Sequence, residues 1–224
     1  KKDDTGDKTD DSNPSTGMEL TQATDLVIAT GGTSGAWYPI GVSIADTLTN
    51  VDNNLFVTSE VTNGGVENAR LLGTHAANVG FVNSDTAYFA THSEDAFASE
   101  PAYELYGLAN LYDSVLEIAV LADSGINSIA DLAGKRVVVG TPASSASTMG
   151  WTVLSTYGLT DKDVKGSELS IAEGVEALKN GDVDCVFIFS AAPNSALTEL
   201  SGTKDFKLLS IDEEHQKAAI EQHS

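Results

Sequence analysis

The chain has 224 residues, of which 41% are hydrophobic and 20% are charged, a composition typical of folded proteins and unlike that of disordered or fibrous chains. Its formal net charge of −21 argues against nucleic acids and anionic membrane surfaces as partners, because both are attracted by a positive field. No run in the sequence approaches the roughly 20 apolar residues that cross a bilayer.

The first segment of the chain contains no large aliphatic or aromatic side chain between residues 1 and 16, so it has nothing to bury against a core. We expect residues 1–24 to form a flexible acidic tether. A leader rich in Asp, Lys, Ser and Thr is typical of a bacterial lipoprotein whose signal peptide and lipid-bearing cysteine have been removed; an ordinary disordered terminus is the alternative. The tether therefore favours an extracytoplasmic location, either periplasmic or lipid-anchored at the cell surface.

From Asp25 onward, short apolar runs alternate with segments of helical period, which predicts βαβ units with a mainly parallel sheet. In the first helix, Pro39 suits the first turn, and Ile40 and Ile44 share one face. The predicted strands are 26–29, 55–61, 79–82, 105–111, 115–121, 136–139, 183–189 and 206–209. The predicted helices are 39–48, 66–72, 85–90, 147–157, 172–179 and 195–200.

The alternation breaks near the middle of the chain, where the predicted strands 105–111 and 115–121 follow one another directly. We interpret this break as the crossing from a first lobe to a second lobe. The predicted organisation is a first lobe at residues 25–112, a second lobe at 113–210, and a segment at 211–224 that returns to the first lobe.

The sequence predicts neither a disulfide nor a metal site. Cys185 is the single cysteine and lies in an apolar run, which is typical of a buried, inert thiol. The four histidines, at positions 75, 92, 215 and 223, have no metal-ligand spacing. We expect no metal and no cofactor.

Three loops are candidates for ligand contact because they follow predicted strands, and ligands of open α/β sheets lie at the carboxyl ends of the strands. The loop at 30–39 is rich in small residues but has neither the P-loop nor the dinucleotide-binding spacing; a purely structural turn is its alternative. The loop at 83–85 also suits a helix cap. The loop at 140–148 gathers hydroxyls and N–H groups at a helix start, a suitable cradle for a carboxylate, although such a loop can also be simply flexible.

The same loops give little indication of catalysis. They contain neither a Gly-x-Ser-x-Gly elbow nor a Ser-x-x-Lys arrangement to activate a serine. With 33 acidic residues in the chain, a pair of carboxylates would be no specific signal of acid–base chemistry. We expect no catalytic residue, and a small hydrolase is the less favoured alternative.

The ordered set of motifs resembles the TAXI family, the solute receptors of one branch of tripartite ATP-independent periplasmic (TRAP) transporters. The resemblance covers residues 26 to about 211, and each motif is weak alone but strong as part of the set. The motifs are TGGTSGAWYP at 30–39, EVTNGGVEN at 60–68, GFVNSD at 80–85, ADSGI at 122–126, LAGKR at 132–136, the serine-rich loop from Gly140, and AAPN at 191–194.

The resemblance implies a type II periplasmic-binding-protein fold, with two α/β lobes joined by a hinge and a ligand cleft between them. It implies a monomeric receptor that captures a carboxylate such as glutamate, glutamine or a related dicarboxylate and delivers it to TRAP permease subunits. Residues at matching motif positions are implied to face the ligand, with Tyr38 or Trp37 packing on its carbon skeleton. They are Gly32, Thr33, Ser34, Tyr38, Asn63, Asn83, Ser84, Ser144, Ser145, Ala146, Ser147, Pro193 and Asn194.

The chain departs from the family pattern in two ways. Its second-lobe loop is richer in alanine and serine than the glycine-rich loop of the family. Members of the family also continue beyond the point where this sequence stops, so we expect the first lobe to be incomplete at the C-terminus, with apolar surface left uncovered. A receptor of an ATP-driven (ABC-type) importer shares the fold and is the principal alternative.

Overall fold

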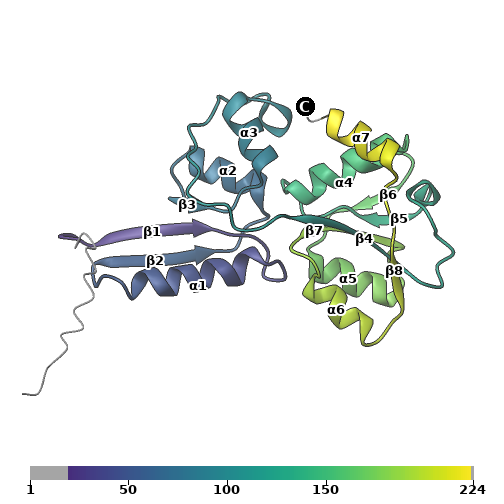
Figure 1. Ribbon diagram of the computed structural model, residues 1–224, viewed down its shortest axis with the longest axis horizontal. Coiled ribbons are helices and arrows are strands. Elements are labelled where there is room, and N and C mark those ends of the chain that lie inside the picture. Colours follow the sequence, from purple (N-terminus) through teal and green to yellow (C-terminus); the bar gives the residue numbers. More distant parts are fainter. Residues whose placement is uncertain (1–19, 223–224) are drawn as a thin grey trace, which may run out of the picture.

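The computed structural model describes residues 20–222 and arranges them in two α/β lobes, each with its own sheet (Figure 1). The three-stranded sheet uses strands between residues 24 and 80, and the five-stranded sheet uses strands between 115 and 208. The predicted lobe boundary at 112 and 113 falls between these two sheets.

Most of the predicted tether, residues 1–19, lies outside the described residues. The remainder is held to the first lobe: the Leu20 amide donates to Asp52 Oδ2 at 2.8 Å, and Asn54 Nδ2 donates to the Leu20 carbonyl at 2.6 Å. Strand β1 then begins at Thr24. The predicted tether therefore extends too far at residues 20–24, because the turn before β2 pairs with this part of the backbone.

The first lobe is built on the parallel strands β1 (Thr24–Ala29), β2 (Leu55–Glu60) and β3 (Val79–Gly80), in the order β2-β1-β3. Parallel neighbours need a crossover, which α1 (Trp37–Thr49) and α2 (Gly65–Gly73) supply. Figure 1 shows α1 along one side of the sheet, with α2 and α3 (Ser84–His92) on the other. A 3₁₀ turn at Asp95–Phe97 follows α3.

The second lobe has a mixed sheet in the order β6-β5-β7-β4-β8. β4 is antiparallel to both of its neighbours, whereas β5 is parallel to β6 and to β7. Apolar residues of β7 and β4 face buried clusters on both sides of this sheet, which explains their nearly continuous hydrophobic runs. The elements are β4 (Val115–Leu121), the 3₁₀ turn Ile129–Leu132, β5 (Arg136–Val138), α4 (Ser145–Thr156), β6 (Lys165–Ser167), α5 (Ile171–Asn180), β7 (Cys185–Ser190), α6 (Ser195–Ser201), β8 (Phe206–Leu208) and α7 (Glu213–Glu221).

The predicted strand at 105–111 is wrong. The segment pairs with no strand among residues 20–222, and Tyr106 and Leu108 are 79% and 80% exposed. Leu105 alone contributes to the first-lobe core, beside Tyr103. The apolar pattern predicted a strand, but a strand also needs a neighbouring strand with free backbone groups, and this segment has none among residues 20–222.

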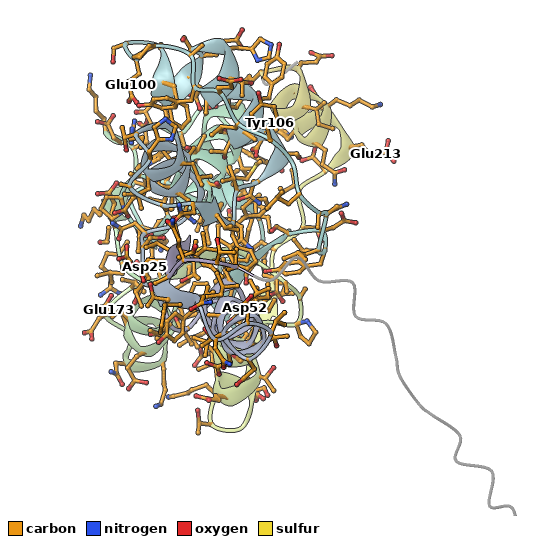
Figure 2. The ribbon with its side chains drawn as sticks, turned by 90° about the vertical axis from the view of Figure 1, so that its left-hand side faces the viewer. Asp25, Asp52, Glu100, Tyr106, Glu173 and Glu213 are labelled. Carbon is orange, nitrogen blue, oxygen red and sulfur yellow. The ribbon has the colours of Figure 1, made fainter. Side chains whose placement is uncertain are left out.

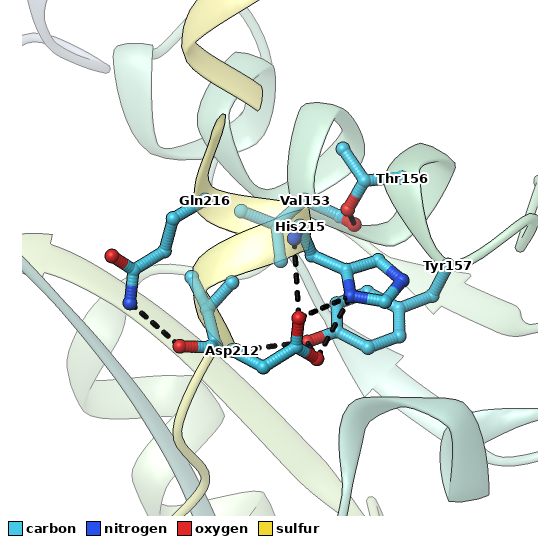
Figure 3. Close-up of polar contacts among 7 residues, drawn as sticks. Val153, Thr156, Tyr157, Asp212, His215 and Gln216 are labelled. Carbon is cyan, nitrogen blue, oxygen red and sulfur yellow. Dashed lines mark hydrogen bonds and ion pairs between the residues drawn. The ribbon is translucent and has the colours of Figure 1, made fainter. Parts of the chain in front are cut away.

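The predicted return of residues 211–224 to the first lobe does not match the structure, because α7 packs on α4 of the second lobe. The rings of Tyr157 and His215 stack with centroids 3.6 Å apart (Figure 3). Tyr157 donates its hydroxyl to Asp212 Oδ2 at 2.9 Å, and Asp212 also caps α7 by accepting from the His215 amide. Hydrogen bonding from His215 is the main cause that lowers the pKa of Asp212 to about 2.

Most acidic side chains of the described residues lie on the outside of the molecule, whereas Glu117 is buried. Asp25 of the first lobe is exposed, and Figure 2 shows Glu173 and Glu213 of the second lobe at the periphery. Cys185 is buried, and burial raises the pKa of its thiol. Within residues 20–222, no helix has the length and hydropathy of a membrane span, and no cluster of His, Cys, Asp and Glu side chains is arranged to hold a metal ion.

Candidate ligand-binding site

A cavity of about 90 Å³ lies between the two lobes. Its first-lobe lining comes from the loop after β1 and from the N-terminal ends of α2 and α3. Its second-lobe lining comes from the loop after β5, from the segment between β6 and α5, and from β7. The lining residues are 31–32, 34–37, 63–65 and 83 of the first lobe, and 138, 140–141, 144–146, 169–171, 186–187 and 189–190 of the second.

Four helices begin at the wall of this cavity, since Trp37, Gly65, Ser145 and Ile171 are the first residues of α1, α2, α4 and α5. The first N–H groups of a helix have no partner inside the helix, and the helix dipole places partial positive charge there. The fold therefore concentrates backbone donors from both lobes around one space, an arrangement that favours an anionic group.

The loop after β1 is fixed at both ends. Thr30 is fully buried and donates its hydroxyl to the Glu60 carbonyl at 2.6 Å, which joins the ends of β1 and β2. A turn closes where the Gly35 amide donates to the Gly32 carbonyl at 2.9 Å. Trp37 then stacks on Phe81, with ring centroids 5.8 Å apart, so one indole face packs on the first lobe while Trp37 still lines the cavity.

Asn68 connects all three strand ends of the first lobe. Its side chain is 0% exposed, and Nδ2 donates to the carbonyls of Thr30 at 2.6 Å and Phe81 at 2.8 Å. Its Oδ1 accepts from the Thr62 hydroxyl at 2.7 Å, and Thr62 in turn accepts from the Gly64 amide. One buried amide group thus sets the positions of the loops that carry the first-lobe lining.

The second-lobe loop is shaped by backbone conformation and by a cap. Gly140 has a φ of +111°, and a Cβ placed there would lie 2.8 Å from the Ala146 side chain, so this position requires glycine. Ser144 caps α4: its Oγ accepts from the Ser147 amide at 3.1 Å and donates to the Thr141 carbonyl at 2.7 Å. The serines of this loop therefore serve first to organise the helix start.

On the same lobe as this loop, Ser170 forms a capping box with Glu173 at the start of α5. The Ser170 side chain is the main cause that lowers the pKa of the Glu173 carboxyl.

At the crossing between the lobes, burial raises the pKa of Tyr112, and the Trp37 side chain partly offsets this effect. Among the described residues, those that line the cavity carry no formal charge.

The two lobes contact each other directly at the cavity. Thr141 donates its hydroxyl to the Asn63 carbonyl at 2.8 Å, and the Ala172 amide donates to Ser34 Oγ at 3.2 Å. The Glu67 amide donates to the Ala143 carbonyl at 3.2 Å. A fourth contact joins the hydroxyls of Thr86 and Ser145 at 2.9 Å. The structure therefore has the lobes closed against one another.

The structure brings seven of the residues named from the sequence to the cavity wall: Gly32, Ser34, Asn63, Asn83, Ser144, Ser145 and Ala146. Of the two aromatic candidates, Trp37 lines the cavity and Tyr38 does not. Thr33, Ser84, Ser147, Pro193 and Asn194 are also absent from the lining.

Physical reasons account for several of these absences. Thr33 and Pro193 are exposed. The Asn194 side chain caps α6 by accepting from the Ala196 amide, and the backbone amide of Asn194 donates to the buried carboxylate of Glu117.

The sequence analysis did not identify Ser170, Phe187 and Phe189, which also line the cavity. The Ser-x-x-Glu capping box at 170–173 was a signal that could have identified Ser170 as the start of a helix at the cleft.

Comparisons with known proteins agree with this architecture. Residues 28–224 match the model of the NMT1-like family. The alkanesulfonate-binding protein SsuA from Xanthomonas axonopodis pv. citri, in a structure bound to MOPS, has 21% identity and a TM-score of 0.56 over 85% of this chain and 62% of its own. The chain thus spans about three fifths of the length of that protein.

Two arginine-binding proteins are similar over most of their own length. An ancestral arginine-binding protein bound to arginine has 15% identity and a TM-score of 0.53, over 88% of this chain and 92% of its own. Holo ArgBP from T. maritima has 14% identity and a TM-score of 0.55, over 88% and 86%. At these identities the likeness concerns the fold, and it confirms the expected α/β fold of periplasmic binding proteins.

Proposed function

The chain belongs to the NMT1-like family, and we propose that it is an extracytoplasmic solute-binding receptor that closes its two lobes over a small carboxylate and performs no chemistry on it. The observation that carries this proposal is the cavity between the lobes, where four helices begin. Backbone N–H groups and hydroxyls bind the carboxylate oxygens at short range. The acidic surface does not prevent this, because surface charge is largely screened beyond about 8 Å at physiological salt.

We assign ligand contact to the residues that combine a predicted role with a place in the cavity wall. In this proposal Ser34, Asn63 and Asn83 supply polar groups from the first lobe, and the loop at 144–146 supplies them from the second. Trp37 packs on the carbon skeleton of the ligand, since this residue lines the cavity and its ring is held by the Phe81 stack.

The ligand class rests on local chemistry and on the resemblance to TAXI receptors. SsuA with MOPS and the arginine-binding proteins with arginine carry chemically different ligands on this fold, so the fold alone does not select one. We propose glutamate, glutamine or a related dicarboxylate as the ligand and TRAP permease subunits as partners, with the receptor acting as a monomer, in the periplasm or lipid-anchored at the cell surface. The ABC-type alternative is favoured by the likeness to the substrate-binding protein of an amino acid ABC transporter, with a TM-score of 0.53.

The hydroxyls of Ser144 and Ser145 support binding over hydrolysis. Ser144 donates to the Thr141 carbonyl, and Ser145 is paired with Thr86, so neither hydroxyl is aligned with a general base. Activating a serine requires such a base within hydrogen-bond reach. A hydrolase that used Ser144 or Ser145 as its nucleophile would therefore need that hydroxyl to leave its present partner.

A thermal-shift screen tests the proposal with the full chain. Dicarboxylates, amino acids and 2-oxo acids form the panel, with arginine and MOPS added because related folds carry them. A ligand at about one hundred times its Kd should stabilise the protein by about 2.7 kcal/mol. Asn83→Ala should reduce the shift, whereas Ser201→Ala, on the exposed face of α6, should leave it unchanged. No shift across the panel with well-folded protein would contradict the proposal, and consumption of a stabilising compound would favour an enzyme.

A further inference from the structure

The hydroxyls of Thr86 and Ser145 form the most deeply buried of the contacts that join the lobes. Their oxygens are 2.9 Å apart, and the two residues are only 4% and 5% exposed. Thr86 belongs to α3 of the first lobe, and Ser145 is the first residue of α4 in the second. Separating the lobes would break this bond and admit water to both groups.

Gly65 lies against the same contact. A Cβ placed on Gly65 would lie 2.6 Å from Ser145 Oγ, a distance that real Cβ atoms do not adopt. Its other neighbours, Asn83 Oδ1 at 3.4 Å and the Asn83 amide at 3.6 Å, are ordinary van der Waals contacts within the first lobe. An alanine at residue 65 therefore fits the first lobe itself and conflicts only with the second.

Backbone conformation does not explain the glycine at this position. The φ of Gly65 lies outside the left-handed region, unlike that of its neighbour Gly64 at +121°. As the first residue of α2, Gly65 occupies a position where alanine has the higher helix propensity. What the position requires is empty space for the Ser145 hydroxyl when the lobes meet.

We propose that Gly65, Thr86 and Ser145 form the closure contact that sets ligand affinity in this receptor. The contact holds the closed lobes together because residue 65 has no side chain. The Ser145 hydroxyl could avoid an added Cβ only by rotating away from Thr86, which would leave two buried hydroxyls without their bond. Either response to Gly65→Ala disfavours closure. This inference rests on the proposed function, because it assumes that the lobes open and close around a ligand.

The experiment measures lobe separation by double electron–electron resonance. Spin labels are attached through Asp46→Cys on α1 and Glu199→Cys on α6, which are both exposed, while Cys185 is buried. In the ligand-free full chain, Gly65→Ala should shift the distance distribution to larger values, with the thermal midpoint kept or raised. Gly107→Ala is the matched control, since a Cβ there meets nothing within 4 Å. Adding Ser145→Ala to Gly65→Ala removes the conflicting oxygen but also the bond to Thr86, so it should move the distribution only part of the way back to the short distance.

Ligand binding provides the second readout, using the compound with the largest stabilisation in the screen. If the closed population falls about tenfold in Gly65→Ala, the apparent Kd rises about tenfold. The double variant is compared by lobe distance alone, because Ser145 is also a proposed ligand contact. An unchanged distance distribution in Gly65→Ala, or no recovery in the double variant, would overturn the closure contact. Failure of every compound to bind the wild-type chain would instead contradict the proposed function, because the distance measurement needs no ligand.

Discussion

Asn68→Ala should destabilise the protein strongly, although residue 68 does not line the cavity. The side chain is fully buried and makes three hydrogen bonds, to the carbonyls of Thr30 and Phe81 and to the Thr62 hydroxyl. Each buried group left without its partner costs about 1–2 kcal/mol. Three such groups give a loss of about 3–6 kcal/mol in the free energy of unfolding, at the upper end of single-substitution effects.

Urea unfolding followed by circular dichroism measures this loss, with amide hydrogen exchange at residues 30, 62 and 81 locating it. Asn180→Ala is the matched control, because Asn180 is exposed at the end of α5 and should change stability by no more than about 0.5 kcal/mol. The reasoning is refuted if Asn68→Ala loses less than about 1 kcal/mol, since the three bonds would then not be holding the strand ends.

Three further predictions concern the second lobe. Phe187→Ala should lower the free energy of unfolding by about 3–5 kcal/mol in urea titrations, because the ring is 1% exposed in the core; a loss near zero would contradict that packing. The Cys185 thiol, whose pKa is raised by burial, should react with a chromogenic disulfide reagent only in denaturant, and rapid labelling of the native chain would disprove its burial. The lowered pKa of Asp212 means that its ionised form stabilises α7; that stability is present above the ordinary carboxyl pKa of 3.8 and should be lost as the pH falls towards about 2. Hydrogen exchange across residues 213–221 between pH 5 and pH 2 measures this, and Asp212→Ala should expose the same amides already at pH 7, whereas unchanged protection would show that the Tyr157–His215 stack is sufficient.

Local patterns in the sequence predicted the elements whose signals are themselves local. The helix that begins near Pro39 and the buried strand that contains Cys185 both follow from periodicity and turn residues, and the structure places them within a few residues of the predicted bounds. The strand β6 was missed because Lys165–Ser167 is short and largely exposed. Helix α7 was missed because it has no buried residue and depends on a stack with Tyr157.

The candidate site was predictable to the extent that it consists of loops following strands. The loops at 30–39 and 140–148 meet at one cavity, as expected from the carboxyl ends of strands. The contact of Thr86 with Ser145 was beyond sequence reasoning, because it depends on how two separately formed lobes dock. The same limit applies to Asn194, whose capping of α6 is compatible with the motif that suggested ligand contact.

The separation between an acidic exterior and a charge-free cavity lining has a kinetic consequence. A carboxylate that approaches the described surface first meets a repulsive field and gains attractive short-range contacts only on entry. Added salt shortens the range of the repulsion without removing the contacts inside. The rate of capture should therefore rise with ionic strength while the rate of release changes little, and stopped-flow measurements in low and high salt would distinguish this behaviour from the slowing expected for a cationic solute.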